Sequence, residues 1–250
     1  MDHFEDYYEG RVKRELAEWE KSLFEEKGFL FKASKQMSMK MNQAIPKKAQ
    51  QAITSAVKVT VKSVLTGAKF IPKNPVIKEA SLYERDQKAI EFMDKYRKIA
   101  VAEGAATGAG GILLGLADFP AFLAIKMNLL FEIAHIYGYD TRSYAERVFI
   151  LYLFQLAFSS NETRRISYEI ICSWKDRLTR YDAPPVTEPE WETFQQEYRD
   201  SIDFRKMLQL LPGIGAIVGA WANNGLTKEL GHTAMNGYRL RYLADHPVKH

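Results

Sequence analysis

The sequence predicts an all-α fold, a multi-helix single domain with two central apolar segments that carry regularly spaced glycines. Apolar residues recur three or four positions apart over most of the chain, which is the period of an amphipathic helix. No stretch alternates apolar and polar residues between hairpin turns, as half-buried strands do. The content of 46% hydrophobic and 26% charged residues is ordinary for a globular protein with a substantial core.

Two helices are expected in the first third of the chain. The first covers residues 4–26, and Gly28 can end it because glycine readily adopts the left-handed conformation that follows many helices. The second begins near Pro46, since proline is tolerated in a first turn, and continues to about residue 70. It cannot extend through residues 71–75, where two prolines prevent the backbone hydrogen bonds of a helix.

Two further helices are expected in the middle of the chain. One runs from about Tyr83 to Gly104, with apolar residues at helical spacing. The next begins after Asp118, which can act as an N-cap and would place Pro120 in the first turn. Gly138 is expected to end this helix as a C-terminal glycine.

The remaining helices lie on both sides of a proline-rich break. Thr141 is expected to cap a helix over residues 144–159, and another follows from Asn161 to about residue 180. Residues 182–189 contain three prolines and are a candidate flexible linker. The last helix covers about residues 212–243. Because neither side of the linker has enough partners for its own apolar helices, all 250 residues are predicted to form one domain.

Two segments contain glycines that are three or four residues apart. They are Gly104, Gly108, Gly111 and Gly115 in the first segment, and Gly215 and Gly219 in the second. Such spacing places glycines on one helix face, where another backbone can approach closely. Each glycine costs about 1 kcal/mol relative to alanine in a helix interior, so close packing is expected to offset that cost.

Three interpretations of the glycine segments remain open: helices that cross inside a soluble core, segments that enter a bilayer, and a glycine-lined ligand pocket. Asp118 interrupts the first apolar run, and the second contains Gln209, Pro212 and two asparagines, so neither resembles an ordinary membrane span. Neither segment matches a phosphate-binding loop or a dinucleotide fingerprint, which argues against nucleotide binding.

Charge is distributed unevenly along the chain. No acidic residue occurs between Glu26 and Glu79, whereas this stretch contains eleven lysines and no arginine. Lysine is a hydrated point charge that suits diffuse attraction to an anionic surface. The predicted lipid-binding residues are Lys47, Lys48, Lys58, Lys62 and Lys69. The alternatives are a domain helix with a solvated lysine face and a nucleic-acid surface, which the missing arginines and stacking aromatic residues disfavour.

The lysine-rich helix also carries an apolar stripe. Five apolar residues can share one stripe: Ile53, Val57, Val61, Val64 and Leu65. Lys58, Lys62 and Lys69 cluster on the other side. A helix of this kind can adsorb to anionic lipid.

Asp118 and Glu132 lie within apolar sequence and are predicted to be buried polar residues. A buried carboxylate requires a partner, and Lys126, Arg239 or Arg241 are the expected candidates. Structural ion pairing is the main interpretation, with acid–base chemistry as the alternative.

A second hypothesis concerns a metal centre. Glu132 and His135 share the Glu-x-x-His spacing of Glu229 and His232, which di-iron carboxylate bundles use twice. Residues that could complete such a set are Glu103, Asp118 and Glu146. Two such pairs also arise by chance in a chain with 31 acidic residues and five histidines. The expectation is therefore no cofactor.

No catalytic residue is assigned from sequence. The only cysteine, Cys172, lies in an apolar stretch and is expected to be a buried small residue. No nucleophile elbow or zinc-binding cluster occurs. The single cysteine and the acidic start of the sequence favour a reducing compartment and argue against a secretory signal peptide.

Several short sequences resemble one family. They include Gly104-Ala-Ala-Thr-Gly-Ala-Gly-Gly, Leu116-Ala-Asp-Phe-Pro and Pro212-Gly-Ile-Gly-Ala-Ile-Val-Gly-Ala. Over about residues 101–243 the chain resembles the EcsC family of bacterial proteins. That resemblance implies an all-α fold and a membrane-adjacent setting, because the family is associated with an ABC-transporter operon. It implies no established reaction.

The charge pattern and the resemblance together predict a non-enzymatic accessory protein. It is expected to bind peripherally to the cytoplasmic face of the cell membrane, with an anionic membrane surface as its partner and assistance to a membrane transporter as a further expectation. Nucleic acid is not expected as a partner. The alternatives are a soluble helical carrier of an apolar small molecule or lipid, and a carboxylate-bridged metal enzyme.

Overall fold

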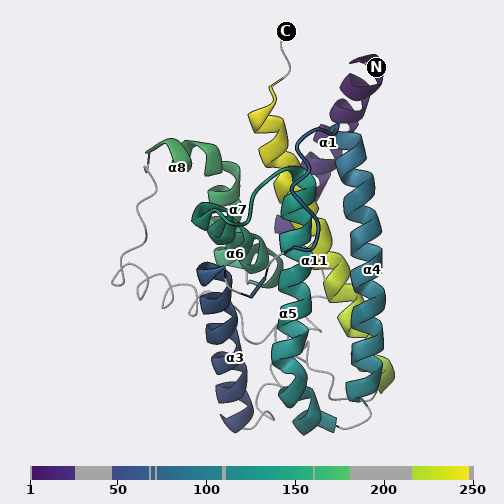
Figure 1. Cartoon of the computed structure of the whole chain (residues 1–250), viewed down its shortest axis with the longest axis vertical. Helices are drawn as coiled ribbons and strands as arrows, with labels where there is room; N and C mark the ends of the chain where they lie inside the picture. The colour runs from purple at the N-terminus through teal and green to yellow at the C-terminus, as the bar shows by residue number, and fades with distance from the viewer. Residues whose placement is uncertain are drawn as a thin grey trace.

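The prediction of an all-α fold is confirmed by the computed structural model. It describes residues 2–25, 47–67, 69–70, 72–108, 111–159, 161–180 and 216–247. These residues form eight helices and no strand (Figure 1). Gly28, Pro46, Gly215 and the candidate linker at 182–189 lie outside the described residues.

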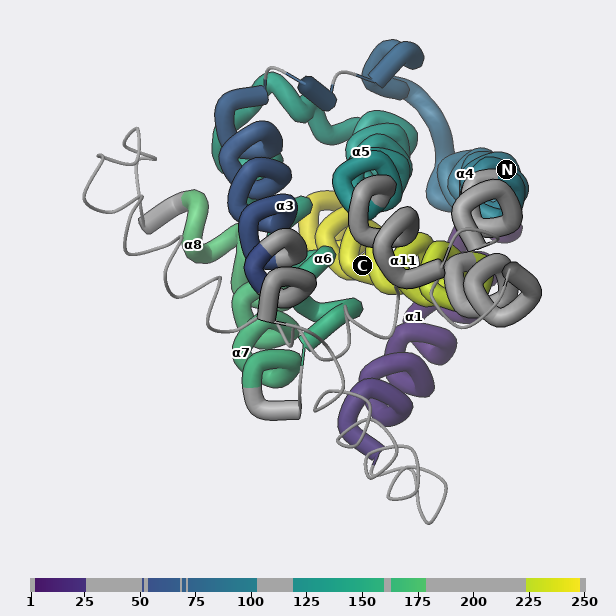
Figure 2. Tube along the Cα trace, turned by 90° about the horizontal axis from the view of Figure 1, so that it is seen from below, coloured from purple at the N-terminus to yellow at the C-terminus, as the bar shows by residue number. Residues whose placement is uncertain are grey.

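The long helices α4, α5 and α11 pack against one another. The helices are α1 (Asp2–Phe24), α3 (Lys47–Thr66), α4 (Leu82–Gly108), α5 (Gly111–Tyr137), α6 (Tyr144–Phe158), α7 (Asn161–Cys172), α8 (Trp174–Arg180) and α11 (Ala216–Asp245). Helix α11 lies beside α4, α5 and α6 (Figure 2). It also contacts α1, α7 and α8. Helix α3 lies at the periphery, where it packs against α5 and α6 (Figure 1).

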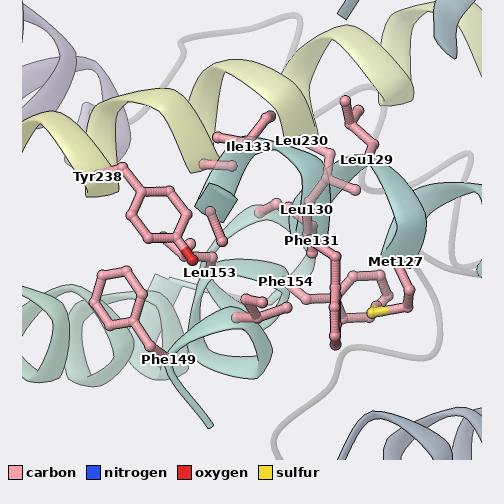
Figure 3. Packing of buried hydrophobic residues seen from close by; sticks show 14 of the residues in the cluster. Met127, Leu129, Leu130, Phe131, Ile133, Phe149, Leu153, Phe154, Leu230 and Tyr238 are labelled. Carbon is pink, nitrogen blue, oxygen red and sulfur yellow. The ribbon is translucent and has the colours of Figure 1, made fainter. Parts of the chain in front are cut away.

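One apolar core joins α5, α6 and α11. Leu130 of α5, Leu153 of α6 and Leu230 of α11 are fully buried, as Figure 3 shows. The stretch Phe119–Tyr137 of α5 is long and apolar enough to cross a membrane, but 72% of that window is buried inside the fold. A helix that is apolar on all sides is expected in such a buried position. Here α5 serves as a core helix.

Two glycines allow α11 to approach its neighbours closely. A Cβ atom on Gly231 would lie 2.7 Å from Cγ of Met93 on α4, and one on Gly237 would clash with Cδ2 of Leu153 on α6. The sequence predicted close helix packing for a different set of glycines, those of the two glycine-spaced segments. Gly104 and Gly108 lie at the end of α4, with Gly111 and Gly115 at the start of α5 and Gly219 near the start of α11. The packing around these five lies outside the description, so their role stays a prediction.

The expected start of the helix after Asp118 is wrong. Helix α5 already begins at Gly111, and Pro120 lies inside it rather than in its first turn. Asp118 is therefore not an N-cap. A proline within a helix removes one backbone hydrogen bond, and burial of the apolar side chains on the following turns outweighs this loss. The side chain of Asp118 lies outside the description, so its burial stays a prediction.

Glycines end two of the helices. Gly138 has a φ of +96° and follows α5, as predicted from sequence. Gly67 has a φ of +69° and ends α3 earlier than expected, with its N–H donating to the carbonyl of Val64 at 3.0 Å. The left-handed conformation at both positions is one that residues with a side chain rarely adopt.

Three expectations about helices α6 to α8 are corrected. Cys172, the last residue of α7, is exposed rather than buried. Thr141 does not cap α6, because Ser143 occupies the N-cap position and its side chain makes no capping bond there. The helix expected from Asn161 to residue 180 is divided into α7 and α8 at Ser173. The hydroxyl of Ser173 donates to the carbonyl of Glu169 at 2.7 Å. Such side-chain bonds compete with the backbone bonds of a helix.

Candidate functional site

Three lysines form an exposed surface on and beside α3. Lys58 and Lys62 are exposed on α3, and Lys69 is exposed just after it; we call these three residues the lysine surface. No ion pair between described residues includes any of them. Lys47 and Lys48 lie in the first turn of α3, and their side chains are outside the description.

The described residues of the apolar stripe of α3, Val57, Val61, Val64 and Leu65, face the core. Val57 and Leu65 are 4% and 6% exposed, and Val64 is fully buried. Because α3 packs against α5 and α6 through this side, the stripe is not available to lipid while α3 stays in place. The lysine surface can therefore meet an anionic partner by charge, whereas insertion of the α3 stripe into a bilayer would require α3 to leave the fold.

A cavity opens beside the lysine surface, between α3 and α5. Its volume is ≈ 350 Å³. It is lined by Ser55, Ala56, Val59, Thr60 and Ser63 of α3, by Lys69 and Phe70, and by Pro120 and Ala124 of α5. Val59 is 58% exposed although it is apolar. The cavity therefore combines an uncovered apolar surface with one lysine of the lysine surface.

A buried ion-pair network lies elsewhere, between α1, α4, α5 and α11. Asp86 of α4 is fully buried and accepts hydrogen bonds from Arg239 at 2.7 and 2.9 Å, from the Tyr8 hydroxyl at 2.7 Å and from the Tyr137 hydroxyl. Arg239 also donates to Glu15 of α1 at 3.1 Å. Burial alone would lower the pKa of Arg239, but the hydrogen bonds and charge of Asp86 raise it.

A second buried pair joins α6 to α11. Glu146 accepts hydrogen bonds from the Tyr238 hydroxyl and from Arg241, both at 2.5 Å. Burial raises the pKa of Glu146, against the opposing effect of the Arg241 charge. Arg241 also lies over the ring of Tyr139, with 3.8 Å between its guanidinium carbon and the ring centroid. Both arginines that were expected to partner Asp118 or Glu132 are thus paired with other carboxylates, which corrects the expectation that one of these arginines pairs with Glu132.

The buried environment of Tyr8 predicts a loss of stability at alkaline pH. Burial, the hydrogen bond to Asp86 and the charge of Asp86 raise the pKa of Tyr8 to about 12. An unfolded tyrosine releases its proton near pH 10. The free energy of the unfolded state therefore falls relative to that of the folded state as the pH rises from about 10 to 12. The contribution of Tyr8 to the free energy of unfolding should be complete below pH 10 and lost across this window.

Chemical denaturation at several pH values tests this expectation. The Tyr8→Phe variant should lose less stability between pH 10 and 12 than the wild type, since it has no phenol at that position. Tyr7→Phe is the matched control, because Tyr7 is 69% exposed on the same helix. An equal pH dependence of Tyr8→Phe and the wild type would contradict the prediction.

Glu132 and His135 attach the segment before α4 to α5. Glu132 is 5% exposed and accepts from the backbone N–H of Lys73 at 3.3 Å and from the side-chain amide of Asn74 at 3.0 Å. Nδ1 of His135 lies 2.8 Å from the carbonyl of Asn74, and Nε2 lies 2.9 Å from the hydroxyl of Thr141. A carbonyl only accepts, so Nδ1 is the donor, and in the neutral imidazole Nε2 then accepts from the Thr141 hydroxyl.

The structure does not bring the four proposed metal ligands together. Glu132 and His135 make the hydrogen bonds described above. Glu229 is exposed on α11, and His232 is half-buried there. Burial lowers the pKa of His232. The described residues contain no group of three or more His, Cys, Asp or Glu that could hold a metal ion. The residues Glu132, His135, Glu229 and His232 thus do not form such a site.

Sequence reasoning missed the buried role of Asp86 and Glu146. Asp86 lies in a stretch of five polar residues, from Glu84 to Lys88, that resembles a solvated helix face. The sequence of α11 did indicate that buried carboxylates must exist. Arg239 and Arg241 occur there among large apolar residues, so each requires a buried acidic partner.

Comparisons with known proteins agree on one family. The model of the EcsC protein family matches residues 10–243. The chain is 40% identical over 234 residues to Protein EcsC of Bacillus subtilis (strain 168), which covers 94% of this chain and 96% of that protein. It is 33% identical over 171 residues to Uncharacterized protein YdbA of the same organism, covering 68% of this chain and 62% of YdbA. No solved structure matches.

Proposed function

The chain belongs to the EcsC protein family, and from this membership we propose that it is a non-enzymatic accessory protein that binds peripherally to the cytoplasmic face of the cell membrane. The lysine surface is the observation that carries the proposal. Lys58, Lys62 and Lys69 are exposed at the periphery of the fold, and no acidic residue occurs in the sequence around them from residue 27 to 78.

The physical basis is electrostatic attraction. Each lysine near an anionic leaflet contributes about 1 kcal/mol, and the attraction falls off within a Debye length. Three lysines alone therefore give weak and reversible binding. Lys73 and Lys78 are also exposed in the segment that follows, and they extend the positive charge beyond α3. Attraction of this kind requires no insertion of α3, whose apolar stripe is already buried.

Assistance to a transport system is the finer part of this proposal. A protein held at the membrane surface by lysines is confined to the plane in which a membrane transporter lies, which raises its local concentration there. A soluble carrier of an apolar small molecule is the second candidate, and the cavity between α3 and α5 is the observation that favours it.

Vesicle flotation tests the membrane proposal. The wild type should float with vesicles that contain phosphatidylglycerol, and much less with vesicles of phosphatidylcholine alone. Raising the salt concentration from 50 to 500 mM should release it, because salt screens exposed charges. Substituting Lys58→Glu, Lys62→Glu and Lys69→Glu together should reduce the bound fraction at least tenfold, since three attractive charges become repulsive.

A matched control separates local charge from net charge. Lys88, Lys95 and Lys98 are exposed on α4, and their triple substitution by glutamate changes the net charge by the same amount. That variant should keep most of its binding. Equal losses in both triple variants, equal flotation on neutral vesicles, or no flotation of the wild type would each overturn the proposal.

A further inference from the structure

We propose that the cavity between α3 and α5 binds a single-chain anionic amphiphile, a fatty-acid carboxylate, with its alkyl chain in the cavity and its carboxylate at Lys69. This site goes beyond the proposed membrane binding, because it would be occupied in solution as well. The two proposals can therefore fail separately.

Small side chains on two helices create the cavity. Ser55, Val59 and Ser63 are four residues apart on α3, so they form one row along that helix. Pro120 and Ala124 are likewise four residues apart on α5. Because most of these side chains are small, the space between the two helices is not filled at this level. The lining of α3 thus extends over about two helical turns, from Ser55 to Ser63.

The lining has apolar surface that the protein itself does not cover. Val59 is 58% exposed, and Ala124 is half-buried. Phe70 is 3% exposed and packs against the ring of Phe131, with 5.7 Å between the ring centroids, so it lines the cavity from a fixed position. The hydroxyl of Ser63 donates to the carbonyl of Val59 at 2.7 Å, so this donor is already used within α3. An alkyl chain is the ligand group that such a lining favours.

The positive charge of Lys69 favours an anionic group at the end of the ligand opposite its alkyl chain. Among the described residues that line the cavity, Lys69 is the one with a charged side chain, and it is exposed. The nearby Lys62 adds positive charge, and the surrounding sequence contains no acid from residue 27 to 78. A carboxylate at Lys69 would thus meet an attractive potential with no opposing acid from this stretch. A neutral apolar molecule would gain no electrostatic attraction from this positive potential.

Size restricts the ligand to one chain. The volume of ≈ 350 Å³ lies at the lower end of small-molecule sites, which measure about 300–1,000 Å³. A phospholipid with two acyl chains and a glycerol headgroup exceeds this space. A single chain that ends in a small anionic group fits it, which is why a free fatty acid is favoured over a membrane phospholipid.

Titration calorimetry with sodium dodecanoate, below its micelle concentration and without vesicles, tests the site on the full-length protein. One dodecanoate should bind per chain. Ala124→Phe should weaken binding at least tenfold by filling the cavity, and Lys69→Gln should weaken it severalfold by removing the charge. Lys88→Gln is the matched control, because Lys88 is exposed on α4 and does not line the cavity, and it should bind like the wild type.

Further measurements distinguish a free fatty acid from a membrane phospholipid as the ligand. They also test whether a loss of binding comes from a disturbed fold. Val59→Trp fills the cavity from an exposed position, so it should reduce binding even if Ala124→Phe disturbs α5. Dodecanol should bind equally to the wild type and Lys69→Gln. A short-chain phosphatidylglycerol should not displace dodecanoate. In vesicle flotation, Ala124→Phe should behave like the wild type, because its lysine surface is intact.

Three results would overturn the site. They are no dodecanoate binding by the folded wild type, unchanged binding by folded Ala124→Phe and Val59→Trp, and displacement by the phospholipid, which would assign the cavity to membrane lipid instead. None of these results alters the flotation outcome, so failure of the cavity is distinguishable from failure of membrane binding.

Discussion

Replacement of Asp86 by alanine is expected to lower the free energy of unfolding by about 3–5 kcal/mol, which is the usual effect of removing one partner of a buried ion pair. Arg239, whose side chain is 5% exposed, would be left with a buried charge, and the hydroxyls of Tyr8 and Tyr137 would lose their acceptor. Urea denaturation monitored by circular dichroism measures the change. The expected result is a lower midpoint with an unchanged slope.

Two comparisons make this prediction specific. Glu25→Ala removes an exposed pair, with 3.7 Å between Glu25 and Lys21, and should cost less than about 0.5 kcal/mol. The double variant Asp86→Leu with Arg239→Met should recover much of the lost stability, because an apolar pair leaves no uncompensated charge. If Asp86→Ala and Glu25→Ala cost the same, Asp86 does not have the role that its contacts indicate.

Substitution of Gly237 by alanine is expected to destabilise the protein by about 1–3 kcal/mol, as overpacking of a close helix contact does. The new methyl group would clash with Leu153, which is fully buried in α6 and has little room to move. The change therefore forces α11 and α6 apart or moves Leu153 out of its position. Thermal denaturation measures the loss.

Gly225 in the same helix is the matched control. No described residue lies within 4 Å of a Cβ atom placed on Gly225, and the residue is exposed. Gly225→Ala should therefore stabilise the protein by about 0.5–1 kcal/mol, because alanine is the better helix former. The two alanine substitutions should thus have effects of opposite sign. A stabilising effect of Gly237→Ala would contradict the close approach of α11 to α6.

Local sequence rules predicted the features that depend on one helix. The period of apolar residues in α3 was sufficient to separate the buried side, with Val57 and Val64, from the exposed Lys58 and Lys62. Gly138 was recognised as a helix end because its left-handed conformation is a local property. Such features require no knowledge of which helices are neighbours.

Features that depend on tertiary contacts could not be predicted in this way. Asp86 lies on a polar stretch of α4 and is buried only because α1, α5 and α11 supply donors to it. Pro120 was taken as a helix start because the local rule places proline in a first turn, whereas core packing keeps α5 continuous through it. In the described part of the chain, Glu132 accepts from a backbone N–H and from an asparagine, whereas Arg239 and Arg241 pair with other carboxylates. In each case the deciding interaction comes from a distant part of the chain.

The packing of α11 against α4 and α5 has a consequence for synthesis on the ribosome. Arg239 of α11 binds Glu15 and Asp86, which precede it by 224 and 153 residues. Translation therefore releases α1, α4 and α5 well before the helix that completes their packing exists. At a translation rate of about 5–20 residues per second, the apolar surface of α5 stays uncovered for on the order of ten seconds before α11 is synthesised. During that interval the nascent chain exposes a surface that chaperones bind, and the native core can close only after α11 emerges.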